Sequence, residues 1–166
     1  MLDACLSAKP SYLRASPDSQ LEIFPLAEQR DSDMRFLFEP RSVAVIGASR
    51  NPAKFGHVQL RNLKELSFQG EIYPVNPNAD QVLGLKAYRS VHEVPAPVDL
   101  AVITIPAPKV PEAVKDCAEK EVKVAVITSS GFGEAGGEGT ERERLVVQIA
   151  KKAGMRIVGP NTTGIV

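Results

Sequence analysis

The chain has 166 residues, of which 43% are hydrophobic, and its 20 basic and 20 acidic residues cancel to a formal net charge of zero. This length and apolar content predict one domain with a sizeable core. The charge balance excludes the basic footprint of a nucleic-acid-binding protein. The longest relevant uncharged run, residues 100–108, is well short of the roughly 18 residues that a membrane span requires, so no membrane partner is expected.

The two cysteines, Cys5 and Cys117, lie far apart and do not form a disulfide framework, which favours a reducing compartment. The first twenty residues carry charges and have no long apolar core, so they do not resemble a signal peptide. We therefore expect a cytoplasmic protein.

Residues 1–34 differ in composition from the rest, because they mix prolines and serines without a sustained hydrophobic period. We interpret them as an irregular N-terminal extension, with a short helical piece around residues 21–30. An expression tag or a poorly ordered leader is the alternative. The remaining residues, 35–166, are predicted to form the domain.

Short β-rich runs predict strands at residues 42–47, 71–75, 99–105, 123–128 and 155–159. The first run is apolar on both of its faces, which is typical of a strand that is covered by helices on both sides of the sheet. Pro74 lies within the second run and indicates a bend or a place near the sheet edge.

Helices are predicted between these strands, the first over residues 55–67. The second is marked by an apolar stripe at helical spacing, which consists of Val110, Ala113, Val114, Cys117 and Ala118. The third covers residues 145–153 and ends at Gly154. Alternating strands and helices predict an α/β fold, with a doubly wound, mainly parallel, Rossmann-like sheet.

In such a sheet the ligand lies beyond the carboxyl ends of the strands, so five loops are candidates: residues 47–56, 75–80, 105–111, 129–139 and 159–164. The first loop begins Gly47, Ala48, Ser49 and leads into a helix N-terminus, which suits a phosphate group. It matches neither the GxGxxG fingerprint nor a Walker loop. A tight turn without a ligand is the alternative.

The second loop reads Val75, Asn76, Pro77 and has no acid before Asp80. A domain that binds a nicotinamide cofactor usually places Asp or Glu here to hold the ribose. This loop argues against such a cofactor and offers a neutral surface for a base.

The third loop, residues 105–109, combines two prolines with a small residue, and its apolar ridge suits a chain-like ligand. A proline-assisted helix entry is the alternative. The fourth loop holds five glycines in residues 129–139, which would give it mobility and allow its backbone to approach a ligand closely. A flexible surface loop without a ligand is the alternative.

No metal site or nucleophile is predicted. Two histidines and two cysteines show no ligand spacing, and no GxSxG motif is present. Cys117 is interpreted as a core thiol. His57 lies close to the first loop, where a surface or capping role is favoured over contact with a ligand.

Six segments in order, residues 38–49, 73–77, 83–88, 98–106, 130–132 and 159–161, resemble the CoA-binding domain of the NDP-forming acyl-CoA synthetases. This superfamily includes the succinyl-CoA synthetase α subunits, and the resemblance runs from residue 36 to residue 166.

The resemblance implies coenzyme A or acyl-CoA as the ligand, with its phosphates at the first loop, adenine near the second and pantetheine along the third. The residues that carry over are Gly47, Ala48, Ser49, Phe55, Gly56, Val75, Asn76, Pro77, Ile105, Pro106, Ala107 and Asn161. Two departures are Asn78, where similar members often have Lys, and Thr162, where the family has Cys.

The family reaction forms acid, CoA and ATP from acyl-CoA, ADP and phosphate through a phosphohistidine in a following domain. We therefore expect a CoA-binding fragment or module that needs further synthetase domains or subunits and does not turn over alone. The alternatives are a CoA-binding sensor domain of a regulatory or protein-acyltransferase chain and an NAD(P)-binding domain.

Overall fold

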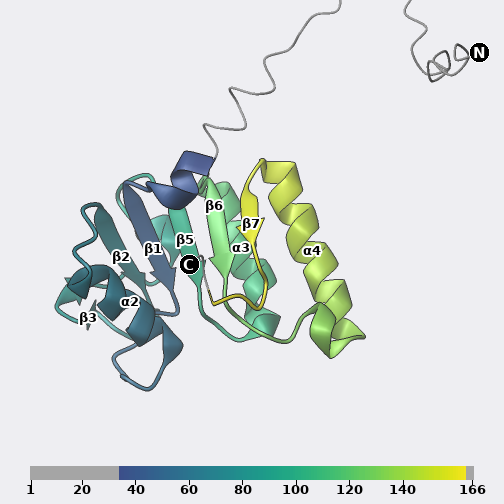
Figure 1. Cartoon of the computed structure of the whole chain (residues 1–166), viewed down its shortest axis with the longest axis horizontal. Coiled ribbons are helices and arrows are strands. Elements are labelled where there is room, and N and C mark those ends of the chain that lie inside the picture. The colour runs from purple at the N-terminus through teal and green to yellow at the C-terminus, as the bar shows by residue number, and fades with distance from the viewer. Residues whose placement is uncertain (1–33, 164–166) are drawn as a thin grey trace, which may run out of the picture.

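The computed structural model describes residues 34–163, which form a five-stranded parallel sheet in the order β2-β1-β5-β6-β7 (Figure 1). The strands are β1 Ser42–Ile46, β2 Glu71–Val75, β5 Leu100–Ile103, β6 Val124–Ile127 and β7 Arg156–Val158. All five lie within the predicted runs, so the doubly wound fold is confirmed. The helical piece predicted around residues 21–30 lies outside the described residues.

Three helices connect and cover the strands. Helix α2 (Phe55–Glu65) joins β1 to β2, α3 (Val110–Glu119) joins β5 to β6, and α4 (Glu138–Ala153) joins β6 to β7. Alternate residues of a strand point to opposite faces, so Ala44 and Ile46 share a core with α3 and α4, whereas Val43 and Val45 share one with α2. The sheet is therefore apolar on both faces, as predicted for its first strand.

The predicted helical landmarks are also confirmed. The apolar stripe of α3 is turned inward, and Cys117 within it has no exposed surface. Helix α4 ends at Gly154, whose φ of 67° is the left-handed conformation that glycine adopts most readily. None of the helices within residues 34–163 combines the length and hydrophobicity needed to cross a membrane.

Strand β2 is one of the two edge strands of the sheet, which explains Pro74. A proline has no N–H to donate, so it is tolerated where the neighbouring strand is absent. The outer side of β2 is partly covered by Tyr88, whose N–H donates to the Pro74 carbonyl oxygen at 2.9 Å. The prediction of a place near the sheet edge is thus confirmed.

The connection from β2 to β5 contains no α-helix. It begins with a hairpin of β3 (Gln81–Val82) and β4 (Leu85–Lys86) and continues through the short 3₁₀ helix η1 (Val91–Glu93). The hairpin turns at Leu83 and Gly84, both at positive φ, which is the backbone signature of a two-residue turn. We did not predict this hairpin, because two-residue strands show no measurable periodicity.

Candidate functional site

The strand order reverses between β1 and β5, so the chain leaves these two strands in opposite directions and a crevice opens beyond their carboxyl ends. A cavity of about 280 Å³ lies there. Its lining includes residues from the ends of β1, β2 and β5 and two cations, namely Gly47, Val75, Asn76, Pro77, Ile105, Pro106, Arg89 and Lys109. We call it the first cavity.

A second cavity, of about 250 Å³, adjoins the start of α2 and the ends of β5 and β6. It is lined by Phe55, Thr104, Ile105, Pro106, Ala107, Thr128, Ser129 and Ser130. Because Ile105 and Pro106 line both cavities, the two lie on either side of this proline-containing segment. The third loop of the sequence is therefore the ridge between two hollows.

Most of the residues predicted to bind a ligand meet at this edge. Six of them line the first cavity, and Phe55 and Ala107 join the lining of the second. Asn161 follows β7, and its N–H donates to the Ser129 carbonyl oxygen at 3.0 Å, which places its loop beside the second cavity. The remaining predicted residues, Ala48, Ser49 and Gly56, belong to the first loop. Contact of any of these residues with a ligand stays a prediction.

Gly56 allows the start of α2 to press against the end of β1. A Cβ atom at this position would lie 2.1 Å from the Gly47 carbonyl oxygen and 2.7 Å from Thr104 Oγ1. Gly47 itself has a φ of 96°, which a residue with a side chain rarely adopts. Both glycines thus bring the first turn of α2 down to the strand ends.

Two side chains contact backbone carbonyl oxygens of the first loop and hold it in place. The Asn76 side-chain amide donates to the Ala48 carbonyl oxygen at 2.7 Å, and His57 Nδ1 lies 2.8 Å from the Ser49 carbonyl oxygen. His57 is buried. The expectation of a surface or capping histidine was therefore wrong: the ring packs under the loop and fixes its path.

Ser49 does not cap α2. Its hydroxyl oxygen accepts the Asn51 N–H at 3.1 Å within the loop. The helix begins after Lys54, and the Lys54 side chain makes no capping hydrogen bond to the described part of the chain. The His57 and Val58 N–H groups donate to the Lys54 carbonyl oxygen at 3.0 and 3.3 Å. Within the described residues, the N–H groups of Phe55 and Gly56 are left for solvent or for an anion, because the helix dipole and these donors both favour negative charge.

The two cations at the first cavity were missed by the sequence reasoning. Lys109 lies within a candidate loop, where the prolines were the only residues that indicated a role. Arg89 lies in the connection between β4 and η1, where no signal marked a site. The cavity also contains the carboxylates of Glu112 and Asp116, so its charge is mixed, with positive groups available for a phosphate.

The second cavity contains hydroxyl groups whose hydrogens are already used. Thr104 Oγ1 donates to Ile46 O at 3.2 Å, and Thr128 Oγ1 donates to Ile103 O at 3.1 Å. Ser129 Oγ donates likewise to Ile105 O. A hydroxyl that has donated its hydrogen retains acceptor lone pairs, so this cavity suits a ligand that carries N–H donors.

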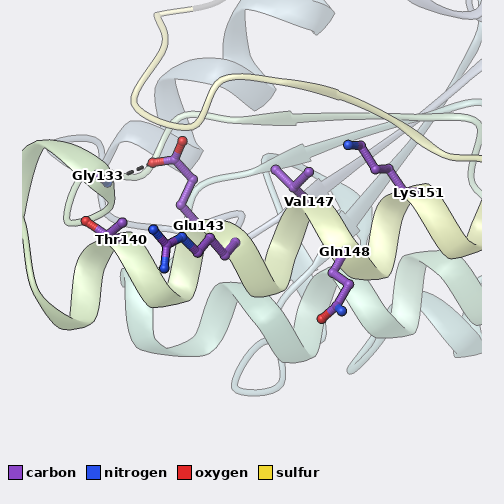
Figure 2. A pocket seen from close by; sticks show the side chains of 7 residues that line it. Gly133, Thr140, Glu143, Val147, Gln148 and Lys151 are labelled. Atoms are coloured by element: carbon purple, nitrogen blue, oxygen red, sulfur yellow. Dashed lines mark hydrogen bonds between the residues drawn. The ribbon is translucent and has the colours of Figure 1, made fainter.

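The glycine-rich loop is more ordered than its composition indicates. Phe132 has no exposed surface, and its N–H and that of Gly131 donate to the Glu134 carboxylate. The Gly131 N–H makes the largest contribution to lowering the pKa of Glu134. The Gly133 N–H donates to Glu143 Oε2 at 2.8 Å (Figure 2). The alternative of a flexible surface loop is therefore not favoured at Phe132.

Figure 2 shows a third, larger hollow on α4, which is lined by Thr140, Glu143, Val147, Gln148 and Lys151 among others. It shares no residue with the two cavities at the strand ends. Size alone would select this hollow as the site. The reversal of strand order, the uncapped helix and the cations select the other edge.

A doubly wound sheet with an uncapped helix start, a neutral loop after its second strand and paired cavities at the switch point is typical of a domain that binds a nucleotide-containing cofactor. The family model described as a CoA binding domain matches residues 41–166. The chain therefore belongs to the CoA binding domain family, and the resemblance seen in its loops is confirmed.

Two of the similar curated proteins are ADP-forming acetate–CoA ligases. The chain is 57% identical over 133 residues to acetate–CoA ligase [ADP-forming] II of Archaeoglobus fulgidus, covering 80% of this chain and 20% of that protein. It is 50% identical over 130 residues to the α subunit of acetate–CoA ligase [ADP-forming] II of Pyrococcus furiosus, covering 78% of this chain and 28% of the subunit. The chain thus spans less than a third of these relatives.

A solved structure agrees with this assignment. Dinucleotide forming acetyl-coenzyme A synthetase 1 of Ca. Korarchaeum cryptofilum, in complex with phosphate and ADP, superposes with a TM-score of 0.76 at 46% identity. The match covers 79% of this chain and 28% of that one. The likeness extends over the described Rossmann-like domain and supports its fold.

Proposed function

We propose that this chain binds coenzyme A across the two cavities and serves as the CoA-binding part of an ADP-forming acyl-CoA synthetase. One observation carries the proposal: two hollows of different chemistry flank the ridge of Ile105 and Pro106. One hollow has two cations beside two carboxylates, and the other has hydroxyl acceptors. CoA has the same division, because phosphorylated adenosine is joined to a pantetheine chain with two amide N–H groups.

The adenosine half belongs with the first cavity. Val75, Asn76 and Pro77 form its neutral wall, and Arg89 and Lys109 supply positive charge. The bridging phosphates then face the first loop and the uncapped start of α2. Arg89 and Lys109 also compensate for Asn78, which stands where similar family members often have Lys.

The pantetheine half belongs with the second cavity. Phe55, Ile105 and Pro106 offer apolar contact to its methylene and methyl groups. Thr128 and Ser129 offer acceptor lone pairs to its amides, since their hydrogens bond to strand carbonyls. The reacting thiol would lie beyond this end.

A nicotinamide dinucleotide fits this edge less well. The end of β2 leads into Asn76 and Pro77, and the Asn76 amide is engaged with the first loop. No carboxylate stands at that position to clamp a ribose. We infer a preference for CoA over NAD.

Isothermal titration of the chain with CoA, NAD and adenosine 3′,5′-bisphosphate tests the proposal. CoA is expected to bind more tightly than the bisphosphate, which lacks pantetheine, and NAD is expected to bind most weakly. Thr128→Val should weaken CoA binding and leave the bisphosphate unaffected, with Thr140→Val on α4 as the matched control. Tighter binding of NAD than of CoA would refute the proposal.

A further inference from the structure

Three metal-ligating side chains meet on the surface where η1 packs against α3. His92 Nε2 lies 3.5 Å from Asp116 Oδ1 and 3.5 Å from Glu119 Oε2. One ligand atom from each of the three lies within 4.8 Å of the others. This group has no signature in the spacing of its residues along the chain, because His92 lies on a different element from the two carboxylates.

We propose that His92, Asp116 and Glu119 form a binding site for a divalent transition-metal ion of the Zn²⁺ class. Zinc bonds to histidine nitrogen and carboxylate oxygen at about 2.0–2.2 Å in a tetrahedron, which sets neighbouring ligand atoms about 3.3–3.6 Å apart. The two distances from His92 already match that spacing. They exceed the usual length of an N–H···O hydrogen bond, about 2.7–3.2 Å.

The donor set decides which ion is bound. Mg²⁺ and Ca²⁺ take oxygen ligands almost exclusively, whereas an imidazole nitrogen suits Zn²⁺, Ni²⁺ and Co²⁺. All three side chains are at least one-third exposed, so an ion can enter from solvent and complete its coordination with water.

The backbone on either side of the group is already anchored. Val91 and Val94 flank His92 and are buried, and the Lys120 ammonium donates to the Val94 carbonyl oxygen at 2.7 Å. Asp116 and Glu119 are three residues apart on α3 and therefore lie on one face of the helix. Only rotations of exposed side chains are needed to close the third edge of the site.

One neighbouring cation competes for the group. Lys115 lies 3.7 Å from Glu119 Oε1, whereas His92 faces the other oxygen, Oε2. The carboxylate can therefore keep its lysine while Oε2 binds an ion. A metal-free arrangement, in which protonated His92 pairs with both carboxylates, is the competing explanation.

The site would join two walls of the first cavity. Asp116 lines that cavity, and so do Ser90 and Val91, which immediately precede His92. An ion that bridges η1 and α3 would therefore hold these walls together. This consequence concerns local stability and does not depend on which cofactor the cavity binds.

The test is a calorimetric titration of the chain with Zn²⁺ at pH 7.5, in a Cys5→Ser background that removes the thiol outside the described residues. Cys117 and His57 are buried and do not compete. One equivalent of Zn²⁺ is expected to bind, with Mg²⁺ much weaker. His92→Gln and Glu119→Gln should each reduce the affinity about 10-fold or more, whereas Glu141→Gln on α4 is the control that should not.

Hydrogen exchange supplies a second readout. Zn²⁺ is expected to slow the exchange of amides in residues 91–94 in the parent chain and to leave them unchanged in His92→Gln. Absence of Zn²⁺ binding up to millimolar concentration would overturn the proposal. So would equal affinity in the parent and in a folded His92→Gln variant.

Discussion

Ser49→Asp separates a phosphate-binding loop from a loop that merely turns. In the structure the Ser49 hydroxyl oxygen accepts the Asn51 N–H at 3.1 Å, and α2 does not begin until Phe55. An aspartate can accept the same N–H, because Asp and Ser share this local turn. The substitution is therefore expected to leave the melting temperature unchanged while it adds one negative charge.

The expected loss in CoA affinity follows from the added charge. A phosphate near the Ser49 side chain would lie about 4 Å from the new carboxylate, where repulsion is about 1 kcal/mol in water and about 4 kcal/mol at an effective dielectric constant of 20. Ser49 is half-buried, so the cost should fall between these limits. It corresponds to a loss of roughly fivefold to several-hundred-fold in affinity.

Ser49→Asn is the matched control, because it keeps the shape and the acceptor without the charge. Calorimetric titration of CoA into both variants, at low and high salt, measures the difference. The gap between them should narrow at high salt, where the Debye length is shorter. Equal CoA affinity in the two folded variants at low salt would refute the location of the phosphates at this loop.

Three further predictions concern stability and turnover. Gly56→Ala should lower the free energy of unfolding by about 2–4 kcal/mol in a urea titration, because its Cβ would meet the Gly47 carbonyl oxygen at 2.1 Å. Gly84→Ala, with open space around it, should cost only about 1–2 kcal/mol through its positive φ, and equal costs would contradict the packing argument. Burial raises the pKa of Cys117 from 9.0 to about 12. Above about pH 9 the unfolded chain alone loses this proton, so stability should fall with pH more steeply in the parent than in Cys117→Ala, and identical slopes would contradict the assignment. Finally, the chain alone should form no ATP from acyl-CoA, ADP and phosphate, since His57 is packed beneath the first loop and His92 lies on η1. ATP above a no-protein control would refute this.

The sequence by itself determined the fold class and the family. Apolar runs such as residues 42–47 and 123–128 are long enough to predict buried strands. The apolar stripe on α3 predicts which face of the helix is buried, because both patterns follow from burial. The edge that carries the candidate site also followed from the sequence, since parallel strands place their following loops together. The lack of an acid directly after the second strand argued against a nicotinamide cofactor, and the resemblance of the loops to a known family indicated CoA.

Only the tertiary structure decided which side chains meet. His57 belongs under the first loop because α2 is drawn against β1 at Gly56, and that close approach has no signature in spacing along the chain. Arg89 reaches the first cavity through the hairpin connection, and His92 meets α3 in the same way. Such encounters depend on how an irregular connection packs across the sheet, and contacts between residues distant in sequence leave no periodic pattern to interpret.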